Sequence, residues 1–172
     1  MVVNHKVDIG FAGTVIDKRL CKYIPFYQDE LIVIAPNNEK YRNISCADAA
    51  WIVNEPLIMR EEGSGTRKEA EKQLKKIGVN IAKLNVIASM ENPEAIKRAV
   101  ASGMGVSLIS RLAAEMELEK GNLIAFPISS EDMRRDIHLI YNRNLQLSRS
   151  ADRLVKVVKE MYKKKERSMK VE

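Results

Sequence analysis

The sequence predicts an α/β fold in which short apolar strands alternate with amphipathic helices. Two observations carry this prediction. The runs 31–35 and 105–109 are almost entirely apolar, which is typical of strands that are buried on both faces. The helical segments repeat apolar residues at helical spacing and stop at a glycine, as at Gly78 and Gly121. Such alternation predicts a mainly parallel sheet with helices on both faces.

The first third of the chain supplies three predicted strands. Residues 7–11 form an apolar run that we expect to be a buried strand ending before a loop. The run 31–35 is stopped by Pro36, Ser45 can cap a short helical turn through Ala50, and 56–60 forms the third strand. A buried strand at the start of a chain needs partners on both edges, so we expect a missing N-terminal portion.

The rest of the chain continues the alternation. In order, the predicted elements are helix 67–77, strand 84–88, a helix from 93 to 102, strand 105–109, helix 111–120, strands 123–127 and 136–141, and a last helix. Ser110 and Ser148 are expected to cap the helices that follow them. The predicted apolar face of the last helix consists of Leu154, Val155, Val158 and Met161. Beyond Lys163 we expect fraying.

Composition narrows the class of protein. The chain has 172 residues, 45% of them apolar, which is enough for one domain or two small lobes. Its two cysteines, Cys21 and Cys46, have no neighbouring CxxC or His/Cys cluster, so we interpret them as reduced thiols. The sequence has no secretory signal and no apolar run of membrane-spanning length. We therefore predict a cytoplasmic protein that makes no contact with a membrane.

The net charge of +6 is concentrated at the C-terminus. Seven basic residues lie in the last seventeen: Lys156, Lys159, Lys163, Lys164, Lys165, Arg167 and Lys170. We interpret them as a solvated helix end in preference to a nucleic-acid contact, because cations suit the C-terminal partial charge of a helix.

The turn from Glu61 to Thr66 is the most informative local feature. It joins a predicted strand to a predicted helix, and Gly63 and Gly65 would let a ligand approach the backbone closely. Ser64 and Thr66 add hydroxyl donors to the free N–H groups of the first helical turn, a combination that suits a carboxylate, sulfate or phosphate. A plain capping box with Glu69 is an equally good interpretation of the local sequence.

A second strand-to-helix turn follows the next strand. Asn92 is a plausible helix cap, and Pro93 suits the first helical position. Taken alone, the segment 91–93 is better interpreted as a cap than as a site. Two such turns at one edge of a sheet nevertheless favour a binding cleft.

Enzymatic chemistry is not indicated. His138 lies in an alternating strand, where we expect a surface or satisfied residue. No nucleophile elbow, acid–base pair or metal-ligand cluster occurs, so we predict no enzyme, no cofactor and no metal.

Several segments, taken in order, resemble the LysR-type transcriptional regulators. Residues 7–11 resemble the family's Asp-[Leu/Ile]-Gly strand, and 29–36 its following strand into the second lobe. Residues 63–67 are similar to its Gly-Ser-Gly-Thr turn, and 93–110 to its most recognisable run. Leu147-Ser148 also fits. The resemblance covers roughly 4–165.

The resemblance implies a two-lobed periplasmic-binding-protein-like (type 2) fold whose first lobe is incomplete here. Residues 1–28 would be the remnant of lobe I, 29–142 the effector-binding lobe II, 143–165 a return to lobe I, and 166–172 a basic tail. The winged helix-turn-helix of the family has no counterpart in the sequence, so DNA would be contacted only through that missing part.

The resemblance also implies a small-molecule effector, which we expect to be anionic, in a cleft between the lobes. The residues carried over to this cleft are Gly13, Thr14, Arg60, Glu61, Glu62, Gly63, Ser64, Thr66, Glu91, Asn92 and Pro93. Glu61 and Glu62 oppose a carboxylate ligand unless the helix N–H groups and Arg60 outweigh them. The effector would shift the orientation of the lobes, and the family implies a homodimer or higher oligomer.

Three rival functions remain open. A solute-binding protein of the same fold would need a signal peptide and two complete lobes. An enzyme on this scaffold would need a coherent set of acid, base or metal groups. A DNA-binding module acting through the basic tail would show salt-dependent binding.

Overall fold

The structure is a computed structural model that describes residues 2–4, 6–15, 18–129 and 134–169, with side chains described up to Tyr162. It divides into two compact units, which we describe separately. Unit 1 comprises residues 1–28 and 135–172, and unit 2 comprises 29–134. The long strand β2 (Cys21–Pro36) contributes residues to both units, because the division falls between Gln28 and Asp29.

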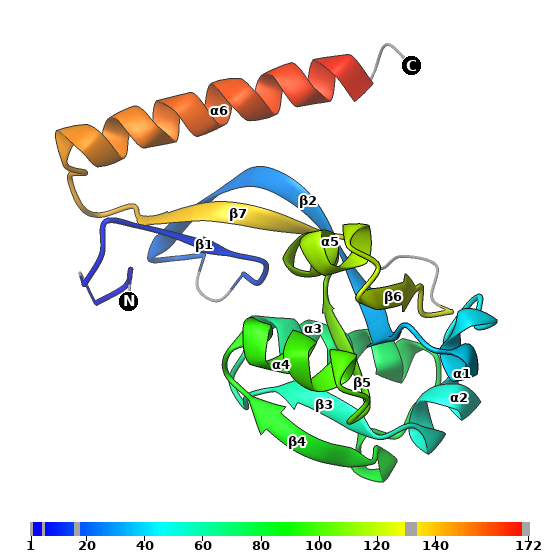
Figure 1. Ribbon diagram of the computed structural model, residues 1–172. Helices are drawn as coiled ribbons and strands as arrows, with labels where there is room; N and C mark the ends of the chain where they lie inside the picture. The colour runs from blue at the N-terminus through cyan, green and yellow to red at the C-terminus, as the bar shows by residue number, and fades with distance from the viewer. Residues whose placement is uncertain (1, 5, 16–17, 130–133, 170–172) are drawn as a thin grey trace. The chain divides into compact units, whose positions relative to one another are not determined.

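Unit 2 is an α/β arrangement, which confirms the predicted fold class (Figure 1). After β2 its elements are α1 (Glu39–Arg42), α2 (Ala49–Asn54), β3 (Leu57–Arg60), α3 (Gly65–Lys76), the 3-10 turn η1 (Ile81–Lys83), β4 (Val86–Met90), α4 (Pro93–Ala101), β5 (Val106–Ser110), α5 (Arg111–Glu119) and β6 (Leu123–Phe126).

The sheet is mixed, so the expectation of mainly parallel strands was wrong in part. Strand β3 pairs in parallel with both β4 and β5. Strand β2 runs antiparallel to β5 and to β6. The antiparallel pairs of unit 2 therefore all involve β2, the strand that the two units share.

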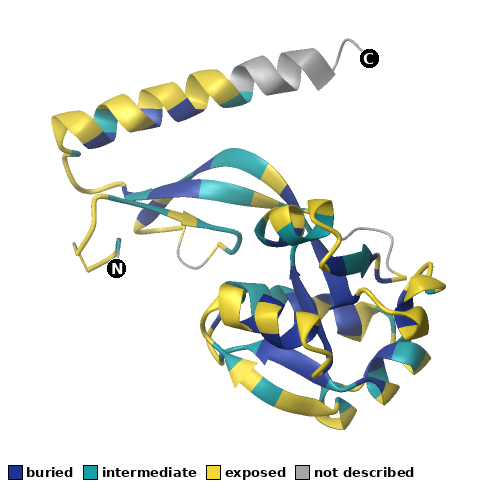
Figure 2. Ribbon diagram, in the orientation of Figure 1, coloured by how far each residue is buried: buried dark blue, intermediate teal, exposed yellow. Residues whose placement is uncertain are grey.

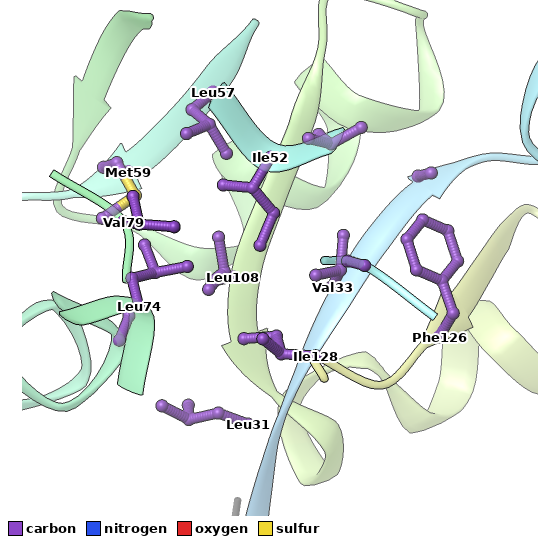
Figure 3. Close-up of a cluster of buried hydrophobic side chains, with 14 of the residues drawn as sticks. Leu31, Val33, Ile52, Leu57, Met59, Leu74, Val79, Leu108, Phe126 and Ile128 are labelled. Carbon is purple, nitrogen blue, oxygen red and sulfur yellow. The ribbon is translucent and has the colours of Figure 1, made fainter. Parts of the chain in front are cut away.

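Helices cover both faces of the sheet in unit 2. The odd-numbered residues of β2 from Leu31 to Ala35 join one buried cluster with Ile52 of α2 and Leu74 of α3 (Figure 3). The even-numbered Ile32 and Ile34 join a second cluster with α4 and α5. Since successive strand residues point to opposite faces, one apolar run serves both cores.

A glycine is required at position 105, between α4 and β5, because the backbone there packs closely against Pro56, just before β3. A Cβ on this residue would collide with the carbonyl oxygen of Pro56. The N–H of Val106 donates to the same carbonyl oxygen at 2.9 Å, which holds β5 against the start of β3.

Unit 1 contains β1 (Ile9–Ala12), the first part of β2, β7 (Arg134–Asn142) and α6 (Arg149–Met169). Strand β1 pairs antiparallel with β7, placing Ile9 opposite Tyr141 and Ala12 opposite His138. The core of the unit is small: Ile24, Leu139, Val155 and Val158 are its buried members.

Several local expectations were wrong in unit 1. Strand β1 is half-buried instead of buried, with Phe11 51% exposed, because β1 lies at the end of the strand order. Helix α6 continues to Met169, past the fraying predicted beyond Lys163. Its residues Leu154 and Met161 are exposed, and Figure 2 shows exposed residues along much of the described part of this helix. Within the described residues, the buried face of the helix is therefore narrower than the apolar face predicted from the sequence.

Two polar predictions also needed correction. Ser45 does not cap α2, which begins later with Asp48 accepting from the N–H of Trp51 at 2.8 Å. His138 is half-buried, and its buried Nδ1 has no hydrogen-bond partner among the described residues, so the expected satisfied histidine is not found. The imidazole ring instead packs edge-on against Tyr23.

Candidate functional site

Three parallel strands of unit 2 end at one edge of the sheet. The register places Arg60, the last residue of β3, opposite Met90, the last residue of β4. The N–H of Glu61 donates to the carbonyl oxygen of Met90 at 3.2 Å, which joins the two turns just beyond the strands. Each of β3, β4 and β5 leads into a helix, so the N-termini of α3, α4 and α5 follow this edge (Figure 1).

The turn before α3 is tight and leaves a serine hydroxyl uncommitted. The N–H of Ser64 donates to the carbonyl oxygen of Glu61 at 3.2 Å, and Gly63 between them has a φ of 90°, a conformation that favours glycine. Ser64 is the N-cap residue of α3 and only 7% exposed, yet its side chain makes no capping hydrogen bond. The alternative interpretation as a capping box is therefore wrong for Ser64, and Glu69 accepts hydrogen bonds from Lys72 and Gln73.

The other helices at this edge use their capping side chains. Asn92 Oδ1 accepts from the N–H of Glu94 at 2.8 Å, and Pro93 occupies the first turn of α4, as predicted. The Ser110 hydroxyl accepts from the N–H of Ala113 and donates to Asp29 Oδ1 at 2.7 Å. Of these three capping side chains, only Ser64 is not engaged by its own helix.

Arg60 and Glu61 form a two-point ion pair at the end of β3. Arg60 Nε lies 2.7 Å from Glu61 Oε2, and Nη2 lies 2.9 Å from Oε1. The hydrogen bonds from the guanidinium hold the pKa of Glu61 below its usual range. The positive charge of Arg60, expected to favour an anion, is thus already engaged by a carboxylate.

Arg67 belongs to this edge, and the sequence-based site did not include it. Its Nη1 donates to the carbonyl oxygen of Arg60 at 3.2 Å, and its Nε pairs with Glu71 at 2.8 Å. Arg67 therefore holds the first turn of α3 against the end of β3. The signal was available, since Arg67 follows directly on the Gly-Ser-Gly-Thr segment.

The predicted site residues fall into two sets. Those from Arg60 to Thr66 and from Glu91 to Pro93 lie in the two turns that the Glu61–Met90 hydrogen bond joins. Gly13 and Thr14 lie in unit 1, where a Cβ on Gly13 would come 3.2 Å from Arg135 Nε. Their grouping with the residues of unit 2 stays a prediction.

Two further properties concern the described residues as a whole. Within them, no cluster of three or more His, Cys, Asp or Glu side chains is arranged to hold a metal ion. None of the helices in the same part of the chain is long and apolar enough to cross a membrane.

Comparison with known proteins identifies the family. Residues 1–163 match the LysR substrate binding domain. The chain is 35% identical over 151 residues to the RuBisCO operon transcriptional regulator of Allochromatium vinosum, covering 88% of this chain and 49% of that regulator. It spans about half the length of the curated relatives that it matches, which are transcriptional regulators and not enzymes.

Solved structures agree with this relationship. The CcmR regulatory domain of Synechocystis PCC6803, in complex with 2-PG, has a TM-score of 0.81 and 25% identity, covering 93% of this chain and 76% of that one. The effector binding domain of QuiR, in complex with shikimate, shares the fold with a TM-score of 0.82 and 18% identity, covering 95% and 75%. The chain therefore belongs to the LysR substrate binding domain family, the effector-binding part of LysR-type regulators.

Proposed function

We propose that unit 2 binds a small effector bearing a carboxylate or phosphate group at the edge where α3 and α4 begin. The observation that carries this proposal is Ser64, a residue only 7% exposed at the start of a twelve-residue helix, whose hydroxyl is not used as a cap. A helix N-terminus offers backbone N–H groups and partial positive charge to an anion. The ligands of related domains, 2-PG for CcmR and shikimate for QuiR, support the same class of small molecule.

In the complete regulator this binding would control DNA binding by a separate part of the protein. An effector shifts an equilibrium between two states only by the difference in its affinity for them. The effector must therefore bind more tightly to one state of the regulator than to the other.

The test is titration of the 172-residue chain with shikimate, 2-PG and inorganic phosphate, followed by calorimetry. We expect Ser64→Ala to lower the affinity for the ligand that binds roughly tenfold, which is the loss expected for one hydrogen bond to a charged group. Asp48→Ala is the matched control, because it removes a working cap from α2 in the same unit. Equal affinities of the Ser64→Ala variant and the unmodified chain, or no saturable binding of any probe, would contradict the proposed site.

We also propose that the regulator is a homodimer and that the β4 edge of unit 2 takes part in the contact. Strand β4 ends the strand order, and its residues Val86 and Ile87 are 40% and 46% exposed. An apolar edge strand is a template for pairing with another chain. Sedimentation should show a dimer that Ile87→Lys dissociates, whereas Lys83→Glu, an exposed change outside the strand, should leave it intact. A monomeric chain, or a dimer unaffected by Ile87→Lys, would rule this contact out.

A further inference from the structure

The Arg60–Glu61 ion pair is placed to select which anions enter the proposed site. We propose that it admits ligands that join an anionic group to a hydrogen-bond donor and disfavours anions that lack a donor. This inference rests on the proposed function, because it concerns the same edge of unit 2.

The pair and the Ser64 hydroxyl belong to one tight turn. Arg60 ends β3, Glu61 begins the turn, and the N–H of Ser64 donates to the carbonyl oxygen of Glu61 at 3.2 Å. The side chains of Arg60 and Glu61 are 20% and 31% exposed, so solvent and solutes reach both of them. A ligand group held by Ser64 is therefore only a few residues along the chain from a guanidinium that already has a carboxylate partner.

The other arginines near this edge are also paired with carboxylates. Arg67 pairs with Glu71 at 2.8 Å, and Arg111, the first residue of α5, pairs with Glu30 at 2.8 Å. Glu62 and Glu91 are exposed and have no ion-pair partner within the part of the chain that the structure describes. An anion that approaches this edge therefore encounters guanidinium groups that are already paired with carboxylates, together with carboxylates that have no ion-pair partner among the described residues.

Glu61 occupies two of the five N–H donors of Arg60, along the edge formed by Nε and Nη2. An anion that binds through this edge takes both donors from Glu61 and leaves an ionised carboxylate that needs new ones. An anion that binds through the remaining donors lies beside that carboxylate. A ligand with a hydroxyl or amino group next to its anionic group supplies such a donor to Glu61. A bare anion such as sulfate supplies none, and the two negative charges repel each other.

The inference is tested by an NMR titration of the 172-residue chain with sulfate and with shikimate, which combines a carboxylate with ring hydroxyl groups. The unmodified chain should bind shikimate at least about tenfold more tightly than sulfate. Glu61→Gln should raise the sulfate affinity roughly tenfold without raising that of shikimate, because the competing charge is removed while the side-chain shape is kept. Glu39→Gln is the matched control: it makes the same change in charge on an exposed side chain of α1, outside the two turns, and should shift both affinities together by less than about threefold.

The outcomes separate this inference from the proposed function. If Glu61→Gln and Glu39→Gln raise the sulfate affinity equally, only net charge matters and the selection is refuted. If Ser64→Ala weakens shikimate binding but Glu61→Gln leaves the ratio of the two affinities unchanged, the site stands and the selection fails. If neither ligand binds the unmodified chain or the Glu61→Gln variant, both the selection and the proposed site fail.

Discussion

At the scale of single residues, Glu61 reports most directly on the candidate site. Its carboxylate accepts two hydrogen bonds from Arg60, which hold its pKa below the usual range for glutamate. A carboxyl with a lowered pKa in the folded state contributes stability above its unfolded pKa, and that contribution is lost as the pH falls through the folded pKa. The pair should therefore open only at pH values below those at which an ordinary glutamate titrates.

Arg60→Gln should return the titration of Glu61 to the ordinary range. The side-chain carboxyl carbon of Glu61, followed by NMR from neutral to acidic pH, should show a higher midpoint in this variant. An unchanged Glu61 midpoint would show that the pair does not persist in solution.

Gly105 is the residue whose substitution we expect to be least tolerated. Gly105→Ala should destabilise the protein by about 2–4 kcal/mol, because the new Cβ meets backbone atoms of Pro56 that cannot rotate away. Gly103→Ala should cost less, about 1–2 kcal/mol, since its φ of 86° strains the backbone but its Cβ would have open space around it. Urea unfolding measures the free energy of unfolding of the two variants. If the Gly103→Ala variant is less stable than the Gly105→Ala variant, the expected order is wrong.

At the scale of elements, Lys97 joins α4 to α5. It is only 5% exposed, and its Nζ lies 2.8 Å from a carboxylate oxygen of Glu94, from one of Glu117 and from the carbonyl oxygen of Ala113. Burial alone would lower the pKa of Lys97, but the hydrogen bonds to Glu117 and Glu94 outweigh it and raise the pKa. The ammonium group therefore stays charged between the helices.

Lys97→Met should lower the free energy of unfolding by about 1–3 kcal/mol at neutral pH, because Glu117 loses its buried partner while Met keeps the packing. A raised lysine pKa contributes stability that is complete below the unfolded pKa and is lost as the pH rises through the folded pKa. The difference between the two proteins should therefore shrink in strongly alkaline solution. It should also shrink in acid, because Glu117, whose pKa is lowered by its hydrogen bond with Lys97, then becomes protonated. Urea unfolding at several pH values measures it, and a constant difference would argue against the ion pairs as its source.

The sequence predicted elements best where the local signals were strong. Asn92, Pro93 and Ser110 start their helices as expected, because a cap and a first-turn proline act within a few residues. The first ten residues of β2 were missed, since Lys22 and Gln28 interrupt the apolar pattern of a strand that only tertiary pairing reveals. The start of α2 was placed at Ser45 because several polar residues precede that helix and sequence alone does not rank them.

The sequence predicted that the two turns adjoin, but not how their side chains are hydrogen-bonded. The two turns that follow β3 and β4 do adjoin, as parallel strands require. Whether the Ser64 hydroxyl caps its own helix, and whether Arg60 is already paired, depends on side-chain rotamers that no sequence pattern fixes. Arg67 was missed for the same reason, because its contact with the carbonyl oxygen of Arg60 exists only after α3 has packed.

At the scale of the whole molecule, the two units differ in the size of their cores. Unit 2 has buried clusters on both faces of its sheet, whereas the buried members of the unit 1 cluster are Ile24, Leu139, Val155 and Val158. Several large apolar side chains of unit 1 are exposed within the described residues: Val3, Val7, Phe11, Val15, Leu20, Leu145, Leu154, Val157 and Met161. Less burial predicts a lower free energy for local opening.

Hydrogen exchange should therefore be faster in β1, β7 and α6 than in β3, β5 and the second half of β2. Mass spectrometry of peptides from the intact 172-residue chain resolves these segments. We expect protection in residues 31–36 to approach that of global unfolding, because their side chains are all buried. Equal protection in both units would show that the chain opens as one cooperative body.

Charge is distributed unevenly as well. Residues 149–169, which form α6, contain eight Lys and Arg against three Asp and Glu, so this helix carries most of the net charge of +6. The side chains of Lys163, Lys164, Lys165, Arg167 and Lys170 lie outside the described residues. DNA binding through this helix stays a sequence-based hypothesis, and a gel shift that weakens steeply with added salt would support it.

The two-faced burial of β2 has a consequence for handling the protein. Residues 31–35 carry no charge, and they are apolar on both sides because each face of the strand has its own core to fill. When the sheet unfolds, this segment becomes exposed, and its high β-propensity and lack of charge make it prone to aggregation. Asp29 and Glu30 before it and Pro36 after it act as gatekeepers, so expression and storage should be more sensitive to their replacement than folded-state stability would suggest.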